Sequence, residues 1–387
     1  MAKALDLQHI PAIDQHCHPW RRMHEPFAVE DYRALFTEGG DLGAGKDANT
    51  TIYYRWTMRE LARILRCDPK EADVLEARAE LGHDAFAAKL MAEANVEAAV
   101  LDHLYTGRGT DNYSVQEMGD RLGGAQTVAA LRLESVLEQI IIESVDAGEV
   151  EARFQARLDR RTLREENVVS LKSIVAYRTG LEIQRWNQEI AYAAFDGLKA
   201  TATATGAVRI AEKPFLDYFL RIALEWCAAE RFPIQFHTGF GDPDVNLITG
   251  NPLMLRGVLQ DPVLREAPIV LLHAGYPYVR ELSYLASIYP NVTMDLGLAI
   301  PFAAGELDAV VRQALAVAPT TKVVWSSDGF ILPEHTWFAA VQGRNALGRV
   351  LGELIDHGAL DRDEAEEVAD QILRGNSRRL YALMGTA

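Results

Sequence analysis

The feature that most constrains the fold of this chain is a repeated alternation of short apolar runs with amphipathic stretches. The apolar runs have the length and composition of buried strands, and the stretches between them have helical periodicity. Eight runs are predicted to be strands: 12–18, 96–105, 127–135, 168–178, 232–242, 268–277, 291–299 and 321–329. Strands that are apolar on both faces and separated by helices are typical of parallel sheets. Eight such units favour a closed α/β architecture, the (β/α)8 TIM barrel.

Two regions lie outside this alternation. Residues 20–92 are long and helical in character, and we interpret them as an insertion after the first strand that caps the barrel mouth. A separate small helical domain is the alternative. Extra amphipathic helices are predicted from about residue 335, and one charged helix is predicted around 148–165. Residues 1–387 are therefore interpreted as a single barrel domain.

Composition narrows the classes of partner. The chain carries 55 acidic and 39 basic residues, a formal charge of −16, which argues against nucleic acid as its main partner. The N-terminal stretch lacks the apolar core of a signal peptide, and no apolar run is long enough to span a membrane. Three widely spaced cysteines do not suggest a disulfide framework. We expect a cytoplasmic protein with a small-molecule substrate, whose insertion and C-terminal helices offer surfaces for a homodimer.

Polar residues cluster where the predicted strands end. The set comprises His16, His18, Lys172, His237, His273 and Asp328. In a barrel all strand C-termini meet at one face, so these residues would converge. The two histidines of His-x-His lie on the same face of an extended strand and can chelate one ion. A third histidine and a carboxylate would complete a catalytic metal site with an open position for water.

Each of these residues alone has a simpler interpretation. A single histidine at a strand end, such as His273, is more often a hydrogen-bonded structural residue, and Asp328 in "SSDG" could start a turn. Their occurrence together, each at the end of a predicted strand, favours a metal site.

The order His-x-His, His, His, Asp on strands one, five, six and eight resembles the amidohydrolase superfamily. The phrases "HCHPW", "FHTGFGD", "LLHAGYPY", "NVTMDLGL" and "SSDG" are similar to its amidohydrolase-2 branch. With "LKSIVAYRTGL", they more narrowly resemble nodulin-like amidohydrolase domains that occur fused to glutamine-synthetase-like domains.

The resemblance implies metal contacts from His16, His18, His237 and Asp328. It implies one divalent ion, for which we expect Zn, with Mn and Fe as alternatives. A metal-activated water would attack the substrate, Asp328 would transfer the proton, and His273 would polarise the carbonyl or stabilise the oxyanion.

Two basic residues are predicted to contact the substrate. Lys172 on strand four is expected to be free, although in binuclear relatives a carboxylated lysine there bridges two metals. Arg178, just past that strand, suits a substrate carboxylate, with a surface salt bridge as the alternative. Further candidates for the cavity wall are Asp102, His103, Tyr105, Glu134 and Asp295, and Trp20 and residues 53–56 could form an apolar lid.

Three functions follow from this pattern. The first is metal-dependent hydrolysis of an amide, perhaps a γ-glutamyl amide, or of a related C–N bond. The second is metal-dependent non-oxidative decarboxylation of an aromatic or unsaturated acid. The third is a non-catalytic barrel scaffold, which predicts broken ligands, whereas all five ligand-type residues are intact.

Overall fold

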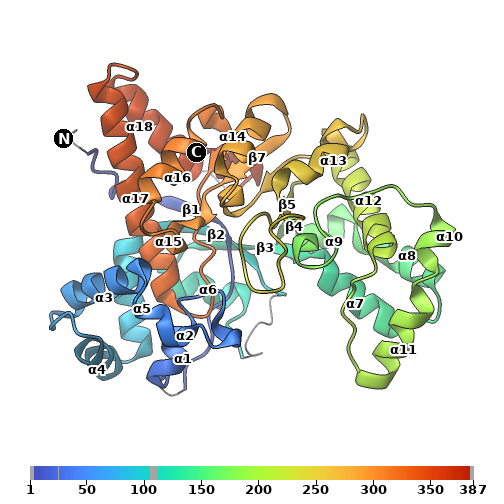
Figure 1. Cartoon of the computed structure of the whole chain (residues 1–387), viewed down its shortest axis with the longest axis horizontal. Coiled ribbons are helices and arrows are strands. Elements are labelled where there is room, and N and C mark those ends of the chain that lie inside the picture. The colour runs from blue at the N-terminus through green and yellow to red at the C-terminus, as the bar shows by residue number, and fades with distance from the viewer. Residues whose placement is uncertain (1–3, 25, 105–110, 384–387) are drawn as a thin grey trace.

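The computed structural model describes residues 4–24, 26–104 and 111–383, and its centre is a parallel sheet of eight strands (Figure 1). Each strand overlaps one predicted strand. In sheet order they are β1 (Ala12–Cys17), β2 (Val96–Asp102), β3 (Gln126–Arg132), β4 (Val168–Ser173), β5 (Ile234–Phe236), β6 (Ile269–Leu271), β7 (Val292–Asp295) and β9 (Val323–Val324). A two-residue segment, β8 (Gly297–Leu298), follows β7 outside this order.

Backbone hydrogen bonds close the sheet between its first and last strands. The amide of Gln15 donates to the carbonyl of Trp325 at 3.4 Å, and the amide of Asp328 donates to the carbonyl of His16 at 3.0 Å. The amide of His18 also donates to the carbonyl of Gly329 at 2.8 Å. These bonds confirm the (β/α)8 barrel, and they join the two strand ends that carry His16, His18 and Asp328.

Helices connect the strands from β2 onward. They are α6 (Val115–Arg121), α7 (Leu133–Glu143), α8 (Ala147–Arg157), α9 (Arg160–Glu165), α10 (Gln188–Tyr192), α11 (Phe195–Thr205), α12 (Lys213–Glu230), α13 (Arg256–Gln260), α14 (Val279–Ile288), α15 (Ala299–Phe302) and α16 (Leu307–Ala314). The single helix predicted around 148–165 is wrong, because it is split into α8 and α9. The side chain of Asp159 accepts a hydrogen bond from the amide of Thr162 and starts a new helix there.

The segment between β1 and β2 is helical, as predicted. It contains α1 (Val29–Ala34), α2 (Gly45–Ala48), α3 (Ile52–Leu65), α4 (Glu71–Leu81) and α5 (His83–Ala94). Tyr53 and Tyr54 of α3 are buried and Trp56 is half-buried, and an apolar lid formed by Trp20 and residues 53–56 stays a prediction. The Tyr53 ring is buried 5.2 Å from Phe36 and 5.0 Å from Phe338, and Trp20 is fully buried. That residues 20–92 cap the barrel mouth stays a prediction.

The C-terminal region forms α17 (Pro333–Asp356), α18 (Arg362–Asp370), a π-helical turn over Gln371–Gly375, and α19 (Asn376–Leu380). The chain then enters the barrel interior, where Tyr381 and Leu383 are buried. Their neighbours from the first three strands are Ile13, Ala98, Val100, Val128 and Ala130. The alanines leave the space that a tyrosine ring needs, so the end of the described chain fills the interior of the barrel.

The fourth strand is shorter than predicted. It ends at Ser173 and not at Arg178, because the chain turns into a 3-10 helix over Val175–Tyr177. The buried carboxylate of Glu134 accepts hydrogen bonds from Ser173 Oγ at 2.7 Å and from the amide of Ile174 at 3.0 Å, in place of a ladder partner. Lys172 is therefore the penultimate residue of β4, close to the active face.

In the described part of the chain, none of the helices is long and apolar enough to cross a membrane.

Candidate metal centre

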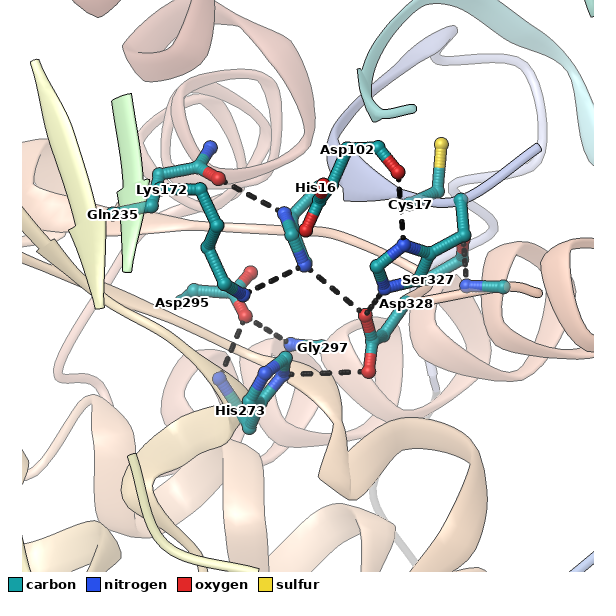
Figure 2. A network of polar contacts seen from close by, with 12 residues as sticks. His16, Cys17, Asp102, Lys172, Gln235, His273, Asp295, Gly297, Ser327 and Asp328 are labelled. Atoms are coloured by element: carbon teal, nitrogen blue, oxygen red, sulfur yellow. Dashed lines mark hydrogen bonds and ion pairs between the residues drawn. The ribbon is translucent and has the colours of Figure 1, made fainter. Parts of the chain in front are cut away.

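Two histidine nitrogens meet one carboxylate oxygen at the C-terminal end of the barrel. Nε2 of His16 and Nε2 of His18 each lie 3.3 Å from Oδ1 of Asp328, and all three side chains are buried. Figure 2 shows the Asp328 carboxylate facing His16 on one side and His273 on the other. The structure thus brings together three of the four residues predicted to contact the metal.

Hydrogen bonds on the far side of each ring decide which nitrogen carries the proton. Nδ1 of His16 lies 2.9 Å from Oε1 of Gln235, and Nδ1 of His18 lies 3.2 Å from the carbonyl oxygen of Asp102. Because these oxygens only accept, both Nδ1 atoms are donors, and an imidazole that donates from Nδ1 has the lone pair of its neutral form on Nε2. Two lone pairs and a carboxylate oxygen therefore face one another.

This arrangement fits a cation. Burial, reinforced by the charge of Lys172, lowers the pKa of His16 to about 4, so its ring is neutral at pH 7. Oδ1 of Asp328 is a buried atom without a hydrogen-bond donor in the described structure. Converging imidazole nitrogens and a carboxylate oxygen are what a divalent ion bound by histidine and aspartate requires.

His273 approaches the same carboxylate from β6. Its Nδ1 lies 3.6 Å from Oδ2 of Asp328, and burial lowers the pKa of His273 well below its ordinary value. His273 and Asp328 both have positive φ, at 67° and 49°, a backbone region that side-chain-bearing residues rarely adopt. Asp295 accepts a hydrogen bond from the amide of His273 at 2.9 Å and supports this turn. Strained conformations of this kind concentrate at functional sites.

His237, the remaining predicted metal contact, lies next to His273, but it is not a member of either close group of ligand-type atoms. Its ring centroid is 4.3 Å from that of His273, and its buried Nε2 has no hydrogen-bond partner among the described residues. Ligand-type atoms lie mutually within 4.8 Å in His16, His273 and Asp328, and in His16, His18 and Asp102. The assignment of His237 as a ligand stays a prediction.

Asp102, which was predicted only as a candidate for the cavity wall, has a carboxylate oxygen within 4.8 Å of ring nitrogens of His16 and His18. Arg132 donates to its Oδ2 at 2.9 Å, whereas the buried Oδ1 has no donor among the described residues. Burial opposes ionisation, but Arg132 holds the pKa of Asp102 well below its usual range. An ionised carboxylate oxygen is therefore available beside His16 and His18.

Lys172 touches the centre directly. Its Nζ lies 3.0 Å from Nε2 of His16, and burial lowers the pKa of Lys172 to about 8 (Figure 2). Lys172 also lines the cavity that opens beside the centre.

A cavity of about 270 Å³ opens beside the centre. Its charged lining consists of four basic and four acidic residues: Arg132, Lys172, Arg178, Arg209, Glu38, Asp242, Asp244 and Asp328. Arg178 forms an ion pair with Glu138 at 3.2 Å, while its buried Nε and Nη1 have no partner in the described structure. The predicted placement of Arg178 at a ligand cavity is thus consistent with its surroundings, and the ion pair lies inside the molecule.

The other residues predicted for the cavity wall have different positions. Glu134 and Asp295 bind backbone and hydroxyl groups next to the strand ends, and His103 does not line the cavity. Tyr105 lies outside the described residues. Gln235 was not predicted, and its only signal in the sequence was a polar residue inside the apolar run "FPIQF".

Comparison with known proteins identifies the family. Residues 13–383 match the family model described as Amidohydrolase. The chain belongs to the amidohydrolase family. This amidohydrolase is 28% identical over 418 residues to Protein fluG of Emericella nidulans, covering 99% of the chain and 47% of fluG. It therefore spans about half the length of that curated relative.

Solved structures agree with this assignment. A provisionally assigned metal-dependent hydrolase from Lactobacillus casei superposes with a TM-score of 0.87 at 26% identity, over 99% of this chain and 98% of that one. A uronate isomerase from Thermotoga maritima has a TM-score of 0.63 at 13% identity, covering 97% and 95% of the two chains, and shows only the shared fold. The family and the Lactobacillus relative make this amidohydrolase an enzyme, which argues against the scaffold hypothesis.

Proposed function

We propose that this amidohydrolase is a metal-dependent hydrolase that cleaves the C–N bond of an amide bearing a carboxylate, such as a γ-glutamyl amide. The observation that carries this proposal is the convergence of two lone-pair Nε2 atoms, of His16 and His18, on one oxygen of Asp328 beside a charged cavity.

His16, His18 and Asp328 would hold the ion, with His237 as the further contact that the family resemblance implies. When bound, a divalent ion acts as a Lewis acid and lowers the pKa of bound water from about 16 toward about 7. The imidazole and carboxylate donors suit Zn, the ion we favour, and Mn and Fe are alternatives.

Asp328 and His273 supply the proton transfer and the polarisation. We assign to Asp328 the acceptance of a proton from the attacking water and its delivery to the leaving amine. His273 is neutral because burial lowers its pKa, and its buried Nδ1 has no hydrogen-bond partner in the described structure. A protonated Nδ1 could therefore donate to the substrate carbonyl oxygen as negative charge develops there.

The charges of the cavity support an amino-acid-like substrate. Arg178 has two buried nitrogen atoms without partners in the described structure, which suit a substrate carboxylate, and Lys172 lines the same cavity. The acidic residues that line this cavity include Glu38, Asp242 and Asp244, of which Asp244 pairs with Arg209 at 3.0 Å, and such carboxylates suit an ammonium group. A γ-glutamyl group carries both charges on one end.

The test is a reaction panel on protein loaded separately with Zn, Mn and Fe. γ-Glutamyl amides, amides without a carboxylate, and aromatic carboxylic acids would be compared for release of amine and of carbon dioxide. Amine release from the γ-glutamyl amides, abolished by Asp328→Asn, is expected. Carbon dioxide release from aromatic acids without any amidase activity would overturn the proposal in favour of decarboxylation.

A further inference from the structure

Three buried polar side chains lie inside the barrel beneath the candidate metal centre and have no role in the mechanism above. They are Gln15 of β1, Gln235 of β5 and Tyr381, which follows α19. Burying such groups is costly unless their hydrogen bonds are satisfied, so the pattern of those bonds is informative.

The surroundings of Gln235 fix the orientation of its amide. Its Nε2 lies 2.9 Å from the backbone carbonyl oxygen of Gln15, which can only accept a hydrogen bond. The NH2 group must therefore point to Gln15, and the carbonyl oxygen Oε1 must point the other way. Oε1 lies 2.9 Å from Nδ1 of His16 (Figure 2).

An irregularity in β1 makes this contact possible. The register between β1 and β2 shifts between Asp14 and Cys17, where three steps along β1 match two along β2. This bulge allows two successive residues, Gln15 and His16, both to reach Gln235, whereas a regular strand would turn them to opposite faces.

Tyr381 completes the network from the other end of the chain. Its hydroxyl lies 2.9 Å from Nε2 of Gln235 and donates to Oε1 of Gln15 at 2.6 Å. The hydroxyl can thus accept the second amide hydrogen of Gln235. The ring is held by Ile13, Ala98 and neighbouring apolar residues of the barrel interior.

We infer that Gln235 and Tyr381 are positioning residues that hold His16 in its Nδ1-protonated tautomer and thereby keep the Nε2 lone pair directed at the metal. Lys172 favours the same tautomer by donating to Nε2, but an ion bound there would replace it. Gln235 is the partner that remains on the ring. The C-terminal segment thus helps to position a metal ligand that lies near the start of the chain.

The first test reads the tautomer and does not require metal binding. Metal-free protein with ¹⁵N-labelled histidine would be studied by NMR in a Lys172→Met background, so that Lys172 does not contribute. His16 is expected to carry its proton on Nδ1, and Gln235→Leu is expected to shift part of the population to Nε2–H. A proton on Nε2 in the presence of Gln235 would overturn the inference.

The second test is metal affinity, measured by competition with a zinc chelator; it rests on the proposed metal centre. Gln235→Leu is expected to weaken Zn binding by about 10–100-fold, as is typical for residues that orient a ligand histidine. Tyr381→Phe should weaken it by a smaller factor. Tyr32→Phe, which removes another buried hydroxyl bonded to Glu334 at 3.1 Å, should leave affinity unchanged.

Thermal unfolding of the metal-free variants separates positioning from general destabilisation. If Gln235→Leu does not fold, Tyr381→Phe decides, because it preserves the ring. Wild-type affinity in a folded Tyr381→Phe variant and in any folded Gln235→Leu variant would overturn the inference. Wild-type protein that binds no metal would instead contradict the proposed function, and the tautomer measurement would still decide the role of Gln235.

Discussion

The ammonium nitrogen of Lys172 lies 3.0 Å from Nε2 of His16, and both side chains are buried. Since Nδ1 of His16 faces Gln235, Nε2 is the nitrogen that a metal ion would use. Lys172 and the ion would thus compete for one lone pair. Either the lysine moves aside when metal binds, or it is carboxylated and becomes a ligand itself.

Replacing Lys172 by methionine distinguishes these two states. With a free lysine, Lys172→Met should bind one metal per chain about tenfold more tightly, because a competing cation worth about 1.4 kcal/mol is removed. Catalysis should fall because a substrate contact is lost. Metal content and chelator competition check this. Two metals in wild type and a loss of one in the variant would instead identify a bridging carboxylated lysine.

Removing the His-x-His pair should abolish metal binding. The double variant His16→Ala with His18→Ala loses both Nε2 atoms that face Asp328 and is expected to retain no stoichiometric metal by plasma mass spectrometry. The matched control is His24→Ala, because the His24 side chain is 77% exposed and pairs with Asp111. Full metal content in the double variant would contradict the assignment of these ligands.

His237 and His273 should respond differently to substitution. As a predicted ligand, His237→Ala is expected to weaken metal binding by about 10–100-fold, comparable to other losses at metal sites. His273→Ala should change kcat more than metal affinity, because its assigned role is at the substrate oxygen. Chelator competition with steady-state kinetics measures both effects. Unchanged affinity in His237→Ala would remove His237 from the ligand set.

Arg178→Met should selectively impair binding of carboxylate-bearing amides. The lost hydrogen bonds to a charged group are worth about 1.5–3 kcal/mol. KM for these amides should therefore rise by about 10–100-fold. Amides without a carboxylate should be affected much less. The control is Arg161→Met, since the Arg161 side chain is 86% exposed and pairs with Glu165. Equal losses for both kinds of substrate would argue against a carboxylate subsite.

The buried His335 should make stability depend on pH. Burial lowers the pKa of His335 from 6.5 to about 4, and its Nδ1 lies 2.6 Å from the Tyr53 hydroxyl. The unfolded chain therefore binds a proton at higher pH than the folded chain does. The lowered pKa of His335 therefore contributes to the free energy of unfolding. This contribution is complete above pH 6.5 and is lost as the pH falls toward 4, in total about 3 kcal/mol.

His335→Gln should flatten this dependence. Between pH 7 and pH 5, urea unfolding of the variant should show a loss of stability about 2 kcal/mol smaller than that of wild type. The exposed His357→Gln serves as the control and should leave the slope unchanged. A variant with the wild-type slope would mean that His335 is not protonated on unfolding in this range.

The sequence by itself determined the barrel and the main members of the site. Apolar runs of strand length, separated by periodic helices, predicted all eight strands, because burial on both sheet faces leaves a pattern that is local in the chain. The ends of those runs identified His16, His18, His273 and Asp328 as residues that would meet, since the barrel gathers its strand ends at one face.

Only the tertiary structure decided what each side chain touches. Glu134 binds Ser173 at the end of β4, Lys172 of the same strand contacts His16, and Gln235 reaches His16 beside a bulge in β1. These contacts join residues far apart in sequence, at distances set by strand register and packing. Neither periodicity nor composition encodes a register shift of one residue, yet such a shift selects which polar groups become partners.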